Sequence, residues 1–497
     1  MEQKTAHSYP AGCYFETLSD IAGKRVTVMG LGLNGGGEAC VRFLLRHGAE
    51  VTVTDMKDEA ELAPTLGRLR SDTRLGFSRV KLVLGRHDTA DFSSADCVIK
   101  NPGIRYEGNG FLAAARAVET DLSIFLHFCR SPIIAVTGSK GKSSTVSAIH
   151  HGLRQAGVNA FLGGNITVSP LTFLDETDES TPVVLELSSW QLRDLRGRGV
   201  LKPKIALLTK IVADHQNWYH GMAAYVADKE LVFAAQTESD YTIAGSGADA
   251  AGDFSVPHGR ADWGDVFAAH THGTVLRTAT QPLAPAESGA WLDGAAGFAR
   301  VAADEPAEQV LGALRVPGEH NRLNALNAAL ALRLMGVPSQ KIRAVMAEWP
   351  GIEHRLEAFY RTERCAFYND SAATVPEAAA AASQAFGEPV TLLCGGTDKD
   401  LDFAPMAAAL SGADGNIAPK RLYALAGTGT EKLLALLRKY GTVCNGPYNS
   451  LQELLRAVKA DGVTGTIVFS PGCTSFGMFK NEFDRGNQFK QAVRGLF

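Results

Sequence analysis

The 497-residue sequence lacks the patterns that mark membrane, secreted and metal-scaffolded proteins. No uninterrupted apolar run reaches the roughly 18 residues that a membrane-spanning helix needs, and the N-terminus carries no charged stretch followed by an apolar one. The eight cysteines are scattered without a C-x-x-C pair, which argues against a zinc site or a disulfide scaffold and fits a reducing compartment. These absences predict a cytoplasmic protein with no membrane partner.

The chain also lacks a strong excess of charge of either sign. Its formal net charge is −4, so no global attraction draws it to nucleic acid, and any phosphate ligand must meet positive charge gathered locally. Hydrophobic residues make up 45% of the sequence and charged residues 21%, as in an ordinary globular protein. A chain of this length is too long for one core, and about three domains are expected.

The most informative stretch is a loop of small residues and lysines in the middle of the chain. A β-branched, apolar run at 133–137 leads into GSKGKSS, and a helical pattern follows. Glycines let backbone N–H groups wrap around phosphate oxygens, and the helix N-terminus adds the positive end of its dipole. We therefore predict a nucleotide-phosphate loop, in which Lys142 reaches the β- and γ-phosphates and Ser143 or Ser144 binds magnesium. The predicted loop residues are Gly138, Ser139, Lys140, Gly141, Lys142, Ser143 and Ser144.

This loop departs from the general G-x-x-x-x-G-K-[ST] pattern, because Val136 stands at the first glycine position. The alternative is a Gly/Ser turn that happens to contain lysines. The flanking strand and helix favour the phosphate loop, since the motif requires that context.

A second glycine-rich turn lies near the N-terminus. An apolar strand at 24–29 runs into Gly30-Leu31-Gly32-Leu33-Asn34-Gly35, a helical pattern follows, and a strand at 50–54 ends at Asp55. G-x-G-x-x-G with an acid twenty residues later is a dinucleotide fingerprint, so an NAD-dependent dehydrogenase is one alternative. The turn can hold any nucleotide diphosphate, so it predicts the fold more firmly than the ligand.

Three polar residues of the middle region are candidates for a role in chemistry. Glu186 lies inside an otherwise apolar predicted strand at 183–192 and needs a partner if buried, which can be a metal ion or an ion pair. His215 follows a strand at 204–208, near the carboxyl end where open α/β sheets bind ligands, although a lone histidine is more often structural. Lys229 lies in a helical stretch, and locally it is typical of a solvated surface lysine.

Strand and helix patterns alternate throughout, which predicts three α/β domains with largely parallel sheets. We place these domains at 1–130, 131–350 and 351–497. Within the second, the stretch at 245–300 predicts short strands with an inserted surface segment, and Asn321 and Asn324 share one face of a long helix.

Taken in order, the motifs resemble those of the Mur ligase family. They are G-x-G-x-x-G, GSKGKSS, ELSSWQL, DH, HNRLN, HR, NDS, GGTDK and SPGCTSFGMFKNEFDRG, and they span almost the whole chain. The resemblance implies a Rossmann-like N-terminal domain for a UDP-sugar, a central P-loop ATPase domain and a Rossmann-like C-terminal domain for the incoming amino acid. It further implies a cytoplasmic, monomeric enzyme of peptidoglycan precursor synthesis. Such an enzyme uses ATP to add glutamate, in the first place D-glutamate, to UDP-N-acetylmuramoyl-L-alanine through an acyl phosphate, releasing ADP and phosphate.

The resemblance also implies roles for individual residues. The catalytic positions are Lys142, Glu186, His215 and Lys229, and Lys229 matches a lysine that the family carbamylates into a metal-binding carboxylate. Two Mg²⁺ ions would be held by Ser143, Glu186, His215 and carbamylated Lys229. ATP would contact the loop residues together with Asn321, Asn324, Arg355 and Asp370. Substrate positions are Leu33, Asn34, Asp55 and Lys57 at the UDP end, Asn165 on the phosphate side, and Thr374, Lys399, Ser475, Phe476 and Phe483 for glutamate.

The chain departs from the family pattern near the acceptor. The family's DSKAT reads DSAAT here, so Ala372 replaces a lysine, and Asn101 stands where a serine is expected before Pro102. A charge-assisted contact contributes roughly 1.5–3 kcal/mol, so the lost lysine bears on how a dianionic acceptor is held, with Lys399 as a replacement. The alternatives are the same ligation with L-glutamate, a folylpolyglutamate-synthase-like ligase, which would begin directly with the ATPase unit, and an ATPase that has lost its acceptor site.

Overall fold

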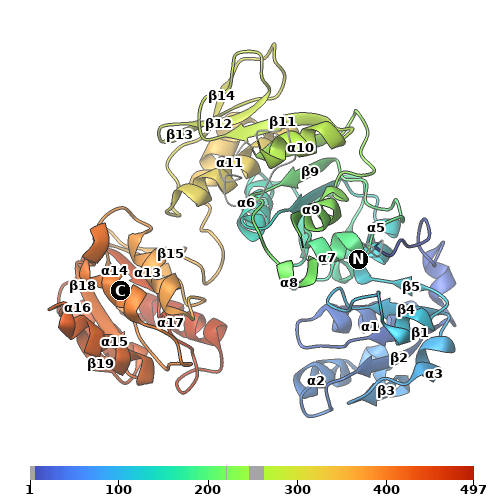
Figure 1. Ribbon diagram of the computed structural model, residues 1–497, viewed down its shortest axis with the longest axis horizontal. Coiled ribbons are helices and arrows are strands. Elements are labelled where there is room, and N and C mark those ends of the chain that lie inside the picture. Colours follow the sequence, from blue (N-terminus) through green and yellow to red (C-terminus); the bar gives the residue numbers. More distant parts are fainter. Residues whose placement is uncertain (1–5, 220, 246–261) are drawn as a thin grey trace. The chain divides into compact units, whose positions relative to one another are not determined.

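The chain folds into three sheets that follow one another in the sequence (Figure 1). The computed structural model describes residues 6–219, 221–245 and 262–497. By their internal contacts, the residues form two compact units: Met1–Gly312 with Leu323–Val345, and Ala313–Arg322 with Met346–Phe497. The first unit contains the first two sheets, and the second contains the third sheet. The predicted α/β class with largely parallel sheets is confirmed.

The first sheet is entirely parallel, in the order β3-β2-β1-β4-β5. Its strands are β1 (Arg25–Met29), β2 (Glu50–Asp55), β3 (Lys81–Leu84), β4 (Cys97–Lys100) and β5 (Val118–Glu119), with helices α1 (Gly36–Arg46), α2 (Ala63–Ser71), α3 (Thr89–Ser93), α4 (Gly110–Ala113) and α5 (Asp121–Phe128). The glycine turn lets α1 approach β1 closely: a Cβ on Gly37 would lie 2.3 Å from the Leu31 carbonyl oxygen. The predicted dinucleotide-type unit is therefore present as a fold.

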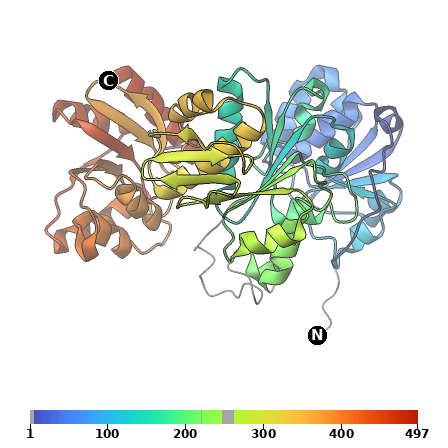
Figure 2. The same ribbon diagram turned by 90° about the horizontal axis from the view of Figure 1, so that it is seen from above.

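The second sheet has nine strands, in the order β14-β13-β12-β11-β10-β9-β6-β8-β7. They are β6 (Ile133–Thr137), β7 (Phe161–Gly164), β8 (Val183–Glu186), β9 (Ile205–Leu208), β10 (Tyr241–Gly245), β11 (Thr274–Ala279), β12 (Gly289–Asp293), β13 (Ala296–Arg300) and β14 (Glu308–Leu311). Its helices are α6 (Lys142–Gln155), α7 (Ser189–Arg193), α8 (Gln216–Tyr219), α9 (Met222–Glu230), α10 (Trp263–His270), α11 (Glu319–Leu334) and α12 (Ser339–Ala347). The pairs β12–β13 and β13–β14 are antiparallel, and the yellow strands of Figure 2 show this edge.

Of two expectations for this region, one is confirmed by the structure and the other is wrong. The short strands predicted within 245–300 are present as β11, β12 and β13, while the part of the predicted insert at 246–261 lies outside the described residues. The apolar run at 183–192 is not one strand. The strand β8 ends at Glu186. Helix α7 begins at Ser189, because the hydroxyl of Ser188 and the side chain of Gln191 form a capping box. Glu186 therefore lies at the carboxyl end of a strand and not inside one.

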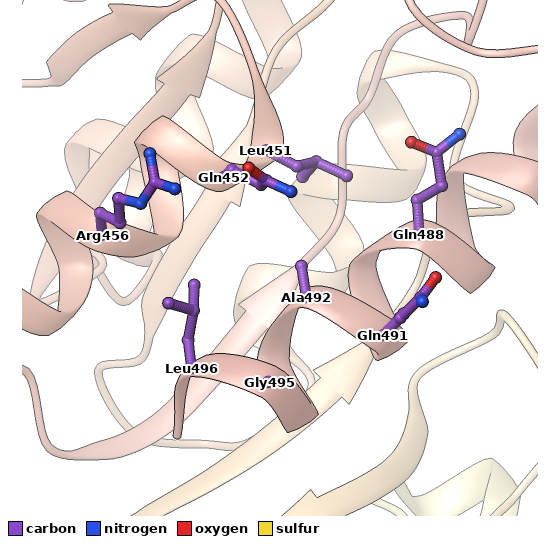
Figure 3. Close-up of a pocket in the computed structure, with 8 residues that line it drawn as sticks. All are labelled: Leu451, Gln452, Arg456, Gln488, Gln491, Ala492, Gly495 and Leu496. Atoms are coloured by element: carbon purple, nitrogen blue, oxygen red, sulfur yellow. The ribbon is translucent and has the colours of Figure 1, made fainter.

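The third sheet has the order β15-β16-β20-β17-β18-β19, antiparallel only between β15 and β16. Its strands are β15 (Glu357–Arg361), β16 (Cys365–Asn369), β17 (Thr391–Cys394), β18 (Arg421–Leu425), β19 (Asn445–Tyr448) and β20 (Gly465–Phe469). Its helices are α13 (Pro376–Gln384), α14 (Ala404–Ser411), α15 (Thr428–Lys439), α16 (Leu451–Ala460) and α17 (Glu482–Leu496). A groove of about 460 Å³ runs between α16 and α17 (Figure 3), and none of the predicted glutamate-binding residues lines it.

Within the described residues, short 3-10 turns lie at Leu18–Ile21, Thr73–Leu75, Phe77–Arg79, Pro170–Thr172, Leu174–Glu176 and Ala413–Gly415. Within the described ranges, no helix combines the length and the apolarity needed to cross a bilayer.

Buried ion pairs and a shared core join the first two sheets. A single apolar cluster runs from Phe15 through the first sheet and into the second as far as Phe267. Lys100, at the end of β4, pairs with Asp194 of the second sheet's α7 segment at 2.6 Å, and Arg198 pairs with Glu119 of β5 at 2.8 Å. All four side chains are almost fully buried, so removing one partner would strand an uncompensated charge. These contacts explain why the two sheets form one compact unit.

Candidate active site

The phosphate loop has the predicted strand–loop–helix context. It joins β6 to α6 and begins and ends with glycines in the positive-φ region, Gly138 at 143° and Gly141 at 93°. A Cβ would lie 1.9 Å from Thr209 Oγ1 at the first position and 2.5 Å from Asn324 Oδ1 at the second. Among the residues that the structure describes, no side chain caps the N-terminus of α6. Within the loop, the N–H groups of Ser139 and Lys140 donate to the Lys210 oxygen at 2.8 and 3.3 Å. The N-terminus of α6, with its helix dipole, is therefore the part of the loop that suits an anion.

Two lysines converge on one carbonyl of this loop. The ammonium of Lys142 lies 2.9 Å from the Gly138 oxygen and 3.2 Å from that of Ser139, while Lys229 donates to the same Gly138 oxygen at 2.8 Å. The Lys229 side chain also lies over the ring of Tyr225, whose hydroxyl is 2.8 Å from Ser139 Oγ. The phosphate-loop residues and Lys229 thus form one cluster, although Lys229 lies 91 residues after Gly138 in the chain.

Burial makes Lys229 chemically unusual. Only 1% of the residue is exposed, so its interpretation as a solvated surface lysine is wrong. Burial, followed by the nearby charge of Lys142, lowers the pKa of Lys229 to about 7. Burial also lowers the pKa of Lys142. A large fraction of Lys229 is therefore the neutral amine near neutral pH, which is the nucleophilic form of a lysine.

Glu186 lies beside this cluster and is incompletely paired. It ends β8, next to Val136 of the loop's own strand, and is 2% exposed. One carboxylate oxygen accepts a hydrogen bond from Asn165 Nδ2 at 2.9 Å, and the other has no hydrogen-bond partner among the described residues. A buried carboxylate oxygen without a donor is costly unless a cation meets it. The donor set at this point fits a divalent cation, which prefers oxygen ligands.

His215 is more loosely held. Its backbone φ is 51°, 45% of its side chain is exposed, and its ring centroid lies 4.9 Å from that of Trp190. The preceding Asp214 pairs with Lys140 of the phosphate loop at 3.3 Å. Within the described ranges, no three His, Cys, Asp or Glu side chains gather as a metal site would require. Glu186 and His215 would therefore hold a cation only together with other oxygens, such as those of phosphates.

The first sheet carries a cavity of about 430 Å³ beside its glycine turn. Asp55 holds that turn in shape, since one carboxylate oxygen accepts from the Gly32 N–H at 3.0 Å and the other from the Lys57 N–H at 2.9 Å. Leu33 and Asn34 are exposed at the turn. The cavity is lined by Met29, Gly30, Gly32, Asp55, Met56, Lys57, His87, Asn101, Ile104, Asn109 and Phe111.

In the second compact unit, the loops after β16 and β20 bring several predicted residues together. Asp370 accepts from Ser470 Oγ at 2.6 Å and from the Leu356 N–H at 3.1 Å, and burial raises its pKa to about 6. Ser475 is buried and Thr374 half-buried, whereas Lys399, Phe476, Phe483 and Arg355 are exposed. Asn321 donates to the Pro317 oxygen at 2.7 Å.

Sequence reasoning gave no role to Arg485. Its guanidinium is 1% exposed and donates to Ser371 Oγ, to the Ser371 oxygen, and to the Cys473 and Thr474 oxygens at 2.8–3.1 Å. It thus ties together the loops that carry Asp370 and Ser475. Burial lowers its pKa to about 10. In the sequence, Arg485 is part of the last motif, SPGCTSFGMFKNEFDRG, and no other signal indicates its role.

The comparisons with known proteins agree with this geometry. The model of the Mur ligase middle domain matches residues 136–332, and that of the Mur ligase MurD-like N-terminal domain matches residues 24–122. The chain is 39% identical to the UDP-N-acetylmuramoylalanine–D-glutamate ligase of Treponema pallidum (strain Nichols), over 96% of this chain and 98% of that protein. It is 35% identical to the ligase of the same name from Roseiflexus sp. (strain RS-1), over 96% and 99%.

Solved structures show the same fold at lower identity. The chain resembles the UDP-N-acetylmuramate–alanine ligase MurC of Thermotoga maritima with a TM-score of 0.53 and 17% identity, covering 95% of this chain and 99% of that one. It resembles MurF of Acinetobacter baumannii with a TM-score of 0.53 and 13% identity, covering 82% and 93%. With its glycine turn, its phosphate loop and near full-length relatives above 30% identity, the chain belongs to the Mur ligase family, with a MurD-like N-terminal domain.

Proposed function

We propose that the chain is an ATP-dependent amide ligase that joins D-glutamate to UDP-N-acetylmuramoyl-L-alanine and releases ADP and phosphate. The observation that carries this proposal is the convergence of Lys142, Lys229 and the uncapped α6 N-terminus on one loop, beside the half-paired Glu186. The ligases of this name in Treponema and Roseiflexus support the choice of acceptor.

The chemistry follows from the weakness of a carboxylate as an electrophile. The loop N–H groups and Lys142 bind the ATP phosphates, and the substrate carboxylate attacks the γ-phosphorus, giving an acyl phosphate and ADP. The amine of glutamate then attacks the acyl carbon, phosphate leaves, and the amine loses its proton as the amide forms. Such a transfer depends on position and positive charge more than on a covalent enzyme intermediate.

Ser143, Glu186 and His215 would hold magnesium, two ions in our proposal, and the metal would supply positive charge to the transferred phosphoryl group. Lys229 would join them as a carbamate. Its neutral amine adds to carbon dioxide, and one proton leaves as the N–C bond forms. The product carries a negative charge next to Lys142, so a repulsive pair of ammonium groups becomes an attractive pair.

The two other clusters take the remaining substrates. The cavity at Gly30, Gly32 and Asp55 would hold the UDP end, with Lys57 and Asn101 at its wall. Thr374, Lys399, Ser475, Phe476 and Phe483 would surround glutamate, and Lys399 would supply the cation that Ala372 lacks. We further propose that the protein acts as a cytoplasmic monomer, without a nucleic-acid or membrane partner.

A dehydrogenase is disfavoured because its reaction would not use the cluster formed by the phosphate loop and Lys229. The assay below decides between this proposal and the ligation of L-glutamate or of a folate-type acceptor.

The test is ADP release by the purified enzyme with ATP, magnesium and defined pairs of substrates. We expect turnover only when UDP-N-acetylmuramoyl-L-alanine and D-glutamate are both present, and none in Lys142→Ala. Lys202→Ala, at an exposed lysine of the same compact unit, is the matched control. Equal turnover with L-glutamate, ADP release without the UDP-sugar, or an active Lys142→Ala variant would contradict the proposal.

A further inference from the structure

A line of four side chains runs from the first sheet to His215. The guanidinium of Arg105 lies over the ring of Trp218, 5.0 Å from its centroid. The ring of Trp218 lies 5.0 Å from that of Trp190, which in turn lies 4.9 Å from the ring of His215. These spacings are those of cation–π and offset aromatic contacts, so each member restricts the next.

The first member of the line is fixed to the nucleotide-sugar cavity. Arg105 follows a turn in which the Ile104 N–H donates to the Asn101 oxygen at 2.9 Å, and both residues of that turn line the cavity. The turn is itself anchored, because the buried ammonium of Lys100 donates to the Ile104 oxygen at 2.9 Å and pairs with Asp194. The position of Arg105 relative to α7, which carries Trp190, is therefore set by a buried ion pair.

The last member needs such support. His215 is a non-glycine residue at a φ of 51°, and its ring lies 3.9 Å from the Asp214 carboxylate and against the ring of Trp190. The indole N–H groups of Trp190 and Trp218 have no hydrogen-bond partner among the described residues. The two indoles thus hold their neighbours through ring faces and not through hydrogen bonds.

We propose that Arg105, Trp218 and Trp190 are positioning residues that hold the His215 ring in place for its role beside the phosphate loop. The inference rests on the proposed function, because that role belongs to it. It also makes the turn that lines the nucleotide-sugar cavity the structural support of a group in the ATP site. Trp190 and Trp218 also pack against the apolar cluster, and Arg105 lies 3.6 Å from the Glu107 carboxylate. The cation of Arg105 adds a contact to the ring of Trp218 that a neutral side chain would not supply.

The experiment compares Arg105→Gln, Arg105→Lys and the control Arg116→Gln, an exposed arginine elsewhere on the first sheet whose ion pair with Asp96 is 3.8 Å long. In Arg105→Gln we expect kcat to fall about three- to tenfold, the size of one cation–π contact, and the magnesium concentration for half-maximal rate to rise by a similar factor. The KM for glutamate should not change. Arg105→Lys should restore most of the rate, and Arg116→Gln should match the wild type.

A spectroscopic readout is independent of turnover. The near-ultraviolet circular dichroism of the Trp190–Trp218 pair should weaken in Arg105→Gln without ligands, and Trp263→Phe should leave that contribution in place. Trp218→Phe should retain more rate than Trp218→Leu at a similar melting temperature.

Several results would overturn the inference. They are wild-type kcat and magnesium dependence in both Arg105→Gln and Trp218→Leu, an equal loss in Arg105→Lys and Arg105→Gln, and a loss confined to melting temperature. An inactive wild-type enzyme would instead refute the proposed function, while the dichroism would still report on the stack.

Discussion

Replacing Lys229 by methionine tests the most unusual group of the site. Methionine keeps the length and apolar stem of the side chain and removes its amine, so the packing under Tyr225 is largely preserved. The pKa of Lys229 falls from 10.5 to about 7, which corresponds to roughly 5 kcal/mol against the protonated form in the folded protein. This penalty comes mainly from burial and then from Lys142, and the variant removes it.

The sign of the effect on stability follows from proton binding. Between pH 7 and 10.5 the unfolded chain keeps a proton on Lys229 that the native chain releases, so native stability from this group rises with pH across that window. Below about pH 7, Lys229 is protonated in both the native and the unfolded protein, so the full free-energy cost of burying its charge lowers the native stability. We therefore expect Lys229→Met to melt at a higher temperature than the wild type at pH 6, and this advantage to shrink steadily as the pH is raised above 7.

The turnover of Lys229→Met should fall, although its melting temperature rises. Without a carbamate at this position, we expect turnover to drop by roughly 100-fold or more, because an anion that would hold magnesium is lost. Short-chain carboxylic acids added to the variant should restore part of it. The assays are calorimetry over a pH series and ADP release, with Lys202→Met as control. A stability difference that does not depend on pH, or full activity of the variant, would refute the reasoning about this lysine.

Three further variants test the rest of the site. Gly138→Ala should abolish ATP turnover because its Cβ would lie 1.9 Å from Thr209 Oγ1, whereas Gly157→Ala, also at positive φ but with open space around it, should only lower the melting temperature; equal activities would argue against the close packing of the loop. Glu186→Gln keeps an acceptor for Asn165 and removes the charge, so turnover should fall about 100-fold with the melting temperature retained, and a collapse of both would mark Glu186 as structural. Burial raises the pKa of Asp370 to about 6, so the native protein binds the extra proton between about pH 4 and 6 and loses that stability as the pH rises. Asp370→Asn should therefore gain stability over the wild type across that window, by up to roughly 3 kcal/mol at pH 7, and a gain seen equally at pH 4 would contradict this cause.

The parts of the fold that depend on neighbours in the sequence could be predicted. The β6–loop–α6 context, the glycine turn with Asp55, and the short strands of the third sheet follow from apolar periodicity and from where glycines stand. The early end of β8 was missed because the capping box at Ser188 competes with an apolar run that also suits a strand.

The parts that depend on distant contacts could not be predicted. Lys229 gives no local sign of burial, since it is removed from water by the packing of α9 against a loop whose Gly138 lies 91 residues earlier in the chain. Arg485 is likewise defined by carbonyl groups more than ten and more than a hundred residues away along the chain. Pairing Lys100 with Asp194 also requires the tertiary fold, and the predicted boundaries at 130 and 350 stay predictions.

The clamp formed by Asp55 has a consequence for how ligand choice can change within this fold. Since both carboxylate oxygens brace the chain's own backbone, the fingerprint acid preserves the shape of the turn whichever nucleotide occupies the cavity. Discrimination then falls to other residues of the wall, such as Met56 and Phe111. A redesign that retargets this domain to another nucleotide should therefore leave the acid untouched and alter the wall.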